Sequence, residues 1–450
     1  MRVNVIGGGL AGSEAAWQVA QLGFEVTLFE MRPGRYTPAH RTGLLAELVC
    51  SNSLKSNALD SASGLLKEEM RRLGSLILRL ADEHSLPAGS SLAVDRLAFS
   101  SSVTSILGNH PRIRIVREEV THFPSEGLTI LASGPLTSPA LISVLGSLID
   151  ETLSTGPLNI FPSRGGGLLS FFDAISPIVL AESLDFSKLF PASRYGRGGN
   201  DFLNSPMSQE EYERFWEELR AAEIAEARDF EVPFFEGCLP VEELACRGKD
   251  TLRFGPMKPV GLIDPKTGGR PWATVQLRRE NRDGTMYNLV GFQTHMKWGE
   301  QKRIFRKIPG LEQAEFCRFG SMHRNTFINS PILLDKNLRW KGKENLFLAG
   351  QITGVEGYVE SVATGLLAGL NAGLLLQQKT MEVPPPDTAL GSLIRYITEA
   401  APDHFQPMNV NFGLFPPFGE GRKIPFRERR MGYSRRSLAS FEQWKARNVA

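Results

Sequence analysis

The chain has 450 residues, of which 42% are hydrophobic and 22% are charged, which is the composition of a folded protein of two or three domains. Its 51 Lys and Arg residues nearly balance 49 Asp and Glu residues, and this total argues against a strongly basic nucleic-acid binder. Four cysteines without a CxxC pair exclude a disulfide scaffold and predict no metal site. The first apolar run is too short for a signal peptide, and we expect a cytoplasmic protein that binds no membrane.

The first thirty residues are typical of a dinucleotide-binding βαβ unit. Residues 3–6 predict a buried strand, residues 13–22 a helix and residues 25–30 a second strand. Glycines at the strand-to-helix turn allow a tight bend and bring the helix N-terminus close to a pyrophosphate. Glu30 ends the second strand and is the expected acceptor for ribose hydroxyls. The residues of the turn are Gly7, Gly8, Gly9, Leu10, Ala11 and Gly12.

A segment near the C-terminus favours FAD over NAD as the bound dinucleotide. Residues 344–350 predict a strand that ends at Gly350, followed by Gln351 and a glycine-rich turn. A helix rich in small residues is predicted from 359 to 376, and such a strand, glycine and helix close the flavin site in two-part FAD-binding folds. Residues 129–134 predict a further strand of the same domain.

We therefore expect an α/β protein with a two-part Rossmann-like FAD-binding domain split around an inserted α/β domain. The expected ranges are 1–142 and 331–450 for the FAD-binding parts, and 143–330 for an inserted domain that holds folate and tRNA. Within the insertion, residues 207–228 predict a charged surface helix, and residues 268–277 and 288–292 predict strands.

The end of the chain is basic, which the total charge conceals. A short helix is expected over 390–399, and residues 422–447 then contain nine Lys or Arg and only two Glu. Aromatic residues lie among these charges, and the combination is typical of an RNA surface with Arg435 and Arg436 as contacts. The alternative is a basic helix that pairs with its own acidic domain. The aromatic residues are Phe426, Tyr433, Phe441 and Trp444.

Several unusual strings together resemble one family over essentially the whole chain, the folate- and FAD-dependent tRNA (uracil-5-)-methyltransferases of bacteria. The resemblance implies synthesis of 5-methyluridine in the T-arm loop of tRNA. It also implies FAD as cofactor, 5,10-methylenetetrahydrofolate as carbon donor and NADPH or NADH as reductant, without an obligate protein partner. The strings lie at residues 7–30, 48–56, 171–177, 193–195, 235–261, 291–298, 322–331 and 349–358.

This chemistry needs an activated cysteine, because carbon 5 of uracil becomes nucleophilic only after a thiolate adds at carbon 6. Cys50 and Cys238 lie in polar loops rich in glycine or serine and match the family's functional cysteines. The resemblance implies that Cys238 is the nucleophile toward uracil and that Cys50 lies near the flavin, where it handles or protects the methylene group. Cys246 and Cys317 match no such motif and are expected to be packing residues.

The resemblance also implies that His295 lies against the pterin ring of folate and that Tyr358 stacks on the flavin. His323 and its two neighbours form a second polar cluster suited to a folate carboxylate or an RNA phosphate. Arg253 and Lys258 are either phosphate ligands, activators of Cys238 or ordinary surface cations.

Two other enzymatic functions remain open at this point: the same chemistry on ribosomal RNA, and flavin-dependent modification of the wobble uridine of tRNA. The wobble-modifying proteins are usually longer, with a helical C-terminal domain that nothing after residue 386 could supply. A flavin-containing RNA-binding protein without turnover would need neither of the two functional cysteines. A disulfide reductase would need a closely spaced cysteine pair, which the sequence lacks.

Overall fold

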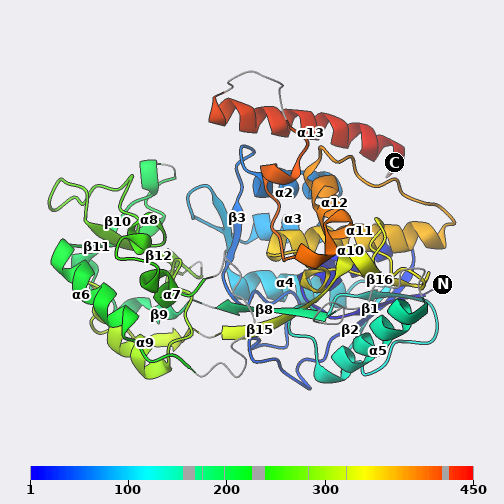
Figure 1. Ribbon diagram of the computed structural model, residues 1–450, viewed down its shortest axis with the longest axis horizontal. Coiled ribbons are helices and arrows are strands. Elements are labelled where there is room, and N and C mark those ends of the chain that lie inside the picture. The colour runs from blue at the N-terminus through cyan, green and yellow to red at the C-terminus, as the bar shows by residue number, and fades with distance from the viewer. Residues whose placement is uncertain are drawn as a thin grey trace.

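The computed structural model describes residues 2–155, 168–174, 176–196, 198–225, 239–281, 283–320, 322–417 and 425–448. Figure 1 shows a larger body, which contains both ends of the chain, beside a smaller one. We call the smaller body, built from residues 176–320, the inserted lobe. Cys238 lies outside the described residues, as do residues 226–228 of the predicted surface helix.

The larger body is built on a parallel sheet of five strands in the order β16-β7-β1-β2-β6. Four of its strands, β1, β2, β7 and β16, are buried over most of their length, as expected where helices cover both faces of a parallel sheet. The predicted Rossmann-type α/β fold is therefore confirmed, with β16 from near the C-terminus paired to β7. The strands are β1 (Arg2–Ile6), β2 (Glu25–Phe29), β6 (Ile113–Val116), β7 (Leu128–Leu131) and β16 (Leu346–Leu348).

Helices α1 (Leu10–Gln21) and α11 (Tyr358–Leu376) pack against each other in the core. A Cβ atom on Gly365 would overlap the backbone of Ala11, which explains the small residues of the predicted helix. Among the described residues α11 is the one helix long and apolar enough to cross a membrane, and 83% of its most apolar stretch is buried inside the protein.

Shorter elements complete the larger body. Helix α5 runs through the predicted boundary between residues 142 and 143, and the predicted domain ranges themselves stay a prediction. The strands are β3 (Ser53–Ser56), β4 (Ser85–Leu86) and β5 (Ser91–Val94) in one sheet, and β8 (Leu168–Ala174) paired with β15 (Met322–Ile328). The helices are α2 (Ala62–Arg72), α3 (Leu76–Glu83), α4 (Arg96–Gly108), α5 (Pro139–Thr155), α10 (Ser330–Leu333) and α12 (Ala389–Glu399).

The inserted lobe contains an antiparallel sheet of six strands in the order β10-β11-β12-β13-β9-β14. Its third strand begins at Ala273, later than predicted, because residues 264–269 form a turn closed by backbone hydrogen bonds. The strands are β9 (Ile178–Leu180), β10 (Phe190–Pro191), β11 (Phe202–Met207), β12 (Ala273–Arg279), β13 (Met286–Leu289) and β14 (Phe316–Arg318). The helices are α6 (Gln209–Arg220), α7 (Val241–Cys246), α8 (Thr251–Phe254) and α9 (Trp298–Phe305).

The predicted surface helix is shorter than expected. Met207 ends β11, and Ser208 then caps α6 with its side chain, so the helix cannot begin earlier. The helix ends at Arg220, and Ile224 pairs with Met296 in an isolated β-bridge.

The basic C-terminal segment forms helix α13 (Phe426–Asn448), which lies across the larger body in Figure 1. Buried Glu69 on α2 accepts hydrogen bonds from the amides of Ala389 and Leu390 and from the Ser437 hydroxyl. One carboxylate therefore joins α2, α12 and α13.

Candidate functional site

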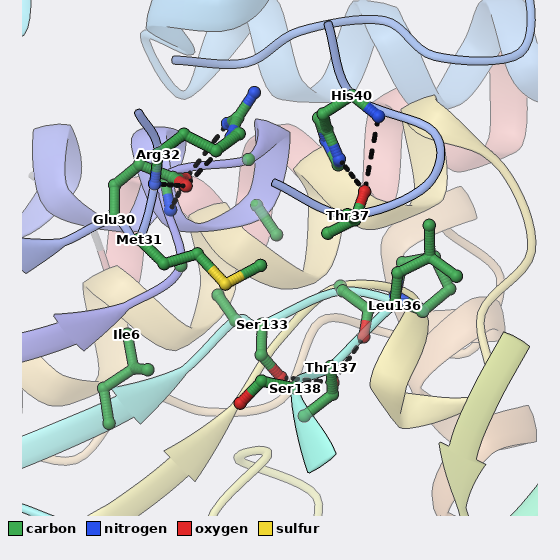
Figure 2. A pocket seen from close by; sticks show the side chains of 18 of the residues that line it. Ile6, Glu30, Met31, Arg32, Thr37, His40, Ser133, Leu136, Thr137 and Ser138 are labelled. Atoms are coloured by element: carbon green, nitrogen blue, oxygen red, sulfur yellow. Dashed lines mark hydrogen bonds and ion pairs between the residues drawn. The ribbon is translucent and has the colours of Figure 1, made fainter. Parts of the chain in front are cut away.

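A cavity opens at the carboxyl ends of the parallel strands (Figure 2). In doubly wound folds this edge of the sheet is where dinucleotides bind. Of the ten residues predicted to bind the cofactor, all except Gly12 line the cavity, although their roles stay predictions. The nine are Gly7, Gly8, Gly9, Leu10, Ala11, Glu30, Gly350, Gln351 and Tyr358.

The glycine turn has the shape that a pyrophosphate needs. Gly7 has a φ of 103°, in the region that favours glycine. A Cβ atom on Gly12 would overlap the carbonyl oxygen of Gly7, whereas no described atom lies within 4 Å of a Cβ atom built on Gly9. Gly12 thus allows close packing beneath the turn, and Gly9 leaves its backbone open to the cavity. The turn fits a dinucleotide.

Glu30 holds this turn in place through hydrogen bonds. Its carboxylate accepts hydrogen bonds from the Gly8 amide and from the backbone and guanidinium of Arg32. Burial would raise the pKa of Glu30, but the hydrogen bonds and charge of Arg32 outweigh it and lower the pKa below its usual value. Since four donors already occupy this carboxylate, a ribose hydroxyl would have to displace one of them. Arg32 was not predicted as a site residue, because a charged residue just after a strand is common in ordinary loops.

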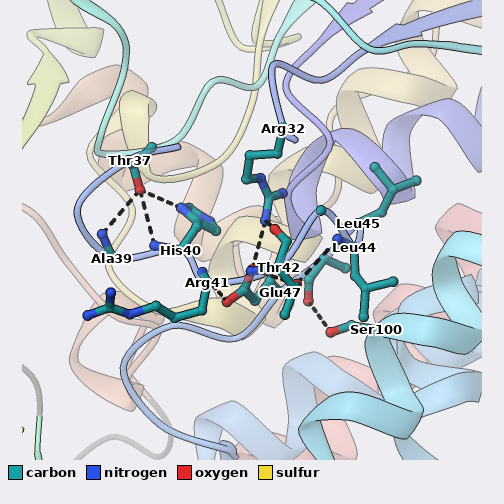
Figure 3. A network of polar contacts seen from close by, with 12 residues as sticks. Arg32, Thr37, Ala39, His40, Arg41, Thr42, Leu44, Leu45, Glu47 and Ser100 are labelled. Carbon is teal, nitrogen blue, oxygen red and sulfur yellow. Dashed lines mark hydrogen bonds and ion pairs between the residues drawn. The ribbon is translucent and has the colours of Figure 1, made fainter. Parts of the chain in front are cut away.

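Residues 37–47 form a polar loop beside the cavity (Figure 3). Glu47 accepts hydrogen bonds from the amides of Arg41 and Thr42 and forms an ion pair with Arg32 at 2.9 Å. His40 lines the cavity, and its Nδ1 lies 2.6 Å from the Thr37 hydroxyl. This loop was not predicted, because its order depends on contacts with the end of β2.

His40 makes this loop sensitive to acid. Burial, followed by the charge of Arg32, lowers the pKa of His40 from 6.5 to about 4. The folded protein therefore binds fewer protons than the unfolded chain between these values, and stability present above pH 6.5 is lost as the pH falls toward 4. We expect His40→Gln to weaken this acid destabilisation, measured as Tm against pH. Wild-type and variant profiles that remain parallel from pH 6.5 to 4 would contradict it.

Tyr358 lines the cavity and its hydroxyl group contacts Cys50, and the position of both residues near a flavin stays a prediction. The Cys50 sulfur lies 3.0 Å from the Tyr358 hydroxyl oxygen, which accepts the Cys50 amide at 2.7 Å and the Ser51 amide at 3.4 Å. Burial raises the pKa of Tyr358 well above its usual value. Its proton therefore stays on the oxygen, and the hydroxyl group holds the Cys50 sulfur and the two amides around it.

Three arginines surround Cys50, and their charges interact with it. Arg96 donates to the Leu48 carbonyl at 2.9 Å and forms an ion pair with Glu280 at 2.6 Å. Arg278 donates to the side chains of Asn52 and Ser51, both at 2.8 Å. Arg318 is the third cation. Positive charge beside a cysteine favours the thiolate. These arginines come from α4, β12 and β14, so no local motif predicts them.

The structure brings His295 to the segment that follows Cys238. Backbone atoms of Val241 and Gln293 form a hydrogen bond of 2.7 Å. The His295 Nδ1 lies 2.8 Å from a carboxylate oxygen of Glu242, which also accepts the His295 amide. His295 is only 4% exposed and does not line the cavity. Its stacking on a pterin stays a prediction.

The remaining candidates are distributed over the surface. Cys246 and Cys317 are exposed, so the expectation that they pack in the core is wrong. Arg253 donates to the Trp272 carbonyl and forms an ion pair with Asp250 at 2.7 Å, so it is anchored at the surface. The side chain of His323 lies outside the described residues.

We expected the aromatic residues of the C-terminal helix to stack on RNA bases among its cations. This expectation is wrong for the aromatic residues that the structure describes. Phe441 and Trp444 are fully buried, and Tyr433 stacks on Phe412 with ring centroids 5.2 Å apart. Their spacing places them on the face of α13 that packs on the larger body. Arg436 donates to the carbonyls of residues 416 and 417 and pairs with Asp387. Arg435 is exposed.

Comparison with known proteins gives consistent results. The family model described as "Glucose inhibited division protein A" matches residues 2–380. The chain is 58% identical over 446 residues to the methylenetetrahydrofolate–tRNA-(uracil-5-)-methyltransferase TrmFO of Geobacter sulfurreducens, covering 99% of each chain. It is 57% identical to the TrmFO of Heliobacterium modesticaldum, covering 100% of this chain and 99% of the other. The structure of Aquifex aeolicus GidA matches with a TM-score of 0.68 at 17% identity, over 98% of this chain and 73% of that one.

Proposed function

The chain belongs to the glucose inhibited division protein A family and, within it, to the methylenetetrahydrofolate–tRNA-(uracil-5-)-methyltransferases, and from this premise we propose its substrate position, cofactors and residue roles. We propose that it methylates carbon 5 of a uridine in the T-arm loop of tRNA. The carbon comes from 5,10-methylenetetrahydrofolate, and the reducing equivalents come from reduced FAD that NADPH or NADH regenerates.

The observation that carries this proposal is the contact of Cys50 with Tyr358, which lines a cavity shaped for a dinucleotide. The glycine turn and the end of β16 would hold the FAD. When bound and reduced, FAD supplies the hydride equivalent that turns a methylene group into a methyl group. A thiol held by a tyrosine hydroxyl and ringed by guanidinium groups is placed for reactive chemistry and not for packing.

We assign separate roles in the reaction to the protein's own residues. Cys238 is assigned the addition to carbon 6 of uracil, which makes carbon 5 nucleophilic toward the methylene carbon. Tyr358 holds the Cys50 sulfur, and the arginines around Cys50 stabilise its thiolate. His295, fixed by Glu242, is assigned the contact with folate. The hydrogen bond between Val241 and Gln293 links the segment that contains His295 to the segment after Cys238.

The test is an incubation of the purified protein with FAD, a tRNA transcript, methylenetetrahydrofolate and NADPH, followed by nucleoside mass spectrometry and mapping of the modified position. We expect 5-methyluridine in the T-arm loop. A transcript with cytidine at that position is the matched control and should remain unmodified. Product on a ribosomal RNA transcript but not on tRNA would overturn the substrate, and product with S-adenosylmethionine as the only donor would overturn the chemistry.

The two arginines of α13 are expected to behave differently. Arg435→Ala removes an exposed charge, and we expect weaker tRNA binding with a salt slope reduced by about 1 and no change in Tm. Arg436→Ala removes the bonds that hold α13 to residues 416 and 417, so we expect a lower Tm. Binding titrations at several salt concentrations and thermal unfolding measure both. Unchanged affinity and salt slope in Arg435→Ala would remove that side chain from the RNA surface.

A further inference from the structure

The inserted lobe exposes apolar side chains that its own fold does not use. Phe254, at the end of α8, is 82% exposed, Ile263 is 67% exposed and Tyr195 is 60% exposed. Trp272 is 36% exposed. We call these four residues the α8 surface. Large apolar side chains gathered in this way on a folded protein mark a binding site more often than a chance arrangement.

Two sets of contacts hold the rings of the α8 surface in place. The ring of Tyr195 lies against Gly261, and its amide donates to the Gly261 carbonyl at 2.9 Å. The guanidinium of Arg253 lies over the ring of Trp272, 3.9 Å from its centroid, and Phe254 is the next residue along α8. Tyr195 has a φ of 58°, which is costly for any residue with a side chain. The fold holds this ring outward in spite of that cost.

The chain around these rings is basic. Residues 247–272 contain six Lys or Arg and two Asp. One aspartate, Asp250, pairs with Arg253, and the other, Asp264, is buried and accepts the Lys266 amide. Glu213 of α6 pairs with a third cation, Lys249, at 2.8 Å. The Arg270 side chain is exposed. The α8 surface therefore offers flat rings within an excess of positive charge.

We propose that the α8 surface binds the unpaired bases of the RNA loop that contains the target uridine, with the surrounding cations on its phosphates. This inference rests on the proposed function. Aromatic rings stack on unpaired bases of any sequence, and cations neutralise the backbone between them. A second copy of this chain fits less well, because a symmetric contact would bring this excess of positive charge against itself.

The location agrees with this role. Helix α8 packs against α7, and α7 begins at Val241, three residues after Cys238. A loop held on the α8 surface is thus bound by elements that continue directly from the segment of the assigned nucleophile. We thus assign stacking on RNA bases to the α8 surface and not to the aromatic residues of α13, two of which are buried.

The test compares Phe254→Ala with Trp298→Ala. Trp298 is 64% exposed on α9, which Figure 1 shows at the opposite end of the inserted lobe from α8. Fluorescence titration of the FAD-bound full chain with an unmodified T-arm hairpin should show at least about fivefold weaker binding for Phe254→Ala, with an unchanged salt slope. Trp298→Ala should bind as the wild type does, and both variants should keep the wild-type Tm and FAD content.

Three further measurements distinguish base stacking from other kinds of contact. Phe254→Ala and the wild type should bind a fully paired RNA duplex of the same length with equal affinity, because the bases of a duplex are not available for stacking. Arg270→Ala should reduce the salt slope by about 1, whereas Lys302→Ala on α9 should not. Equal hairpin affinity of Phe254→Ala and wild type would overturn the proposal, as would a wild-type dimer in sedimentation that Phe254→Ala converts to a monomer. Hairpin binding that depends on Phe254, without any 5-methyluridine formation, would overturn the proposed function and leave the α8 surface standing.

Discussion

Cys238→Ala is expected to retain FAD and lose formation of 5-methyluridine by at least about a thousandfold. Loss of the sulfur removes the group that adds to carbon 6, and without that addition carbon 5 of uracil is too weak a nucleophile to take the methylene carbon. The FAD cavity is formed by segments of the larger body, none of which includes residue 238. The measurement is a single-turnover assay by nucleoside mass spectrometry, with the flavin spectrum as the check on FAD.

Cys246→Ala is the matched control for this experiment. It removes the same chemical group eight positions along the chain, at an exposed site near the end of α7. We expect wild-type turnover from it. A Cys238→Ala protein that methylates at the wild-type rate would show that another group adds to uracil. A protein trapped on RNA through Cys238 but not through Cys246 would identify the covalent bond directly.

Local patterns predicted the parts of the fold that local forces determine. The glycine turn, the strands beside it and the helix with small residues follow from spacing within single segments, and their boundaries differ from the structure by only a few residues. The end of α6 was missed, because the charged sequence continues past Arg220 while the chain turns to pair Ile224 with Met296.

The polar surroundings of the candidate site could not be predicted in this way. The arginines around Cys50 lie far apart in the sequence, and each alone has the appearance of a surface cation. Composition was misleading for α13, because it does not show that the described aromatic residues are buried against the larger body. Phe441 and Trp444 face the core, whereas Arg435 faces solvent.

Two alanine substitutions in the glycine turn are expected to separate FAD binding from folding. Gly9 has an extended backbone, with φ of −75°, and an open Cβ direction, so Gly9→Ala should change the stability of the FAD-free protein by less than about 1 kcal/mol. The added methyl group occupies the space through which a pyrophosphate approaches, so FAD affinity should fall by at least about tenfold. Gly12→Ala should instead prevent correct packing, because its methyl group overlaps the Gly7 carbonyl oxygen.

Gly146→Ala in α5 is the control, since that position also has open space for a Cβ atom but does not line the cavity. Alanine in place of glycine there should leave FAD affinity unchanged and raise stability by up to about 1 kcal/mol. Thermal unfolding with and without added FAD measures both effects, because a ligand that binds only the folded state raises Tm by an amount that increases with the logarithm of its affinity. A Gly9→Ala protein whose Tm rises with FAD as much as that of the wild type would place the pyrophosphate away from this turn. Equal FAD-free stability of Gly12→Ala and wild type would mean that the turn can relax around the added methyl group.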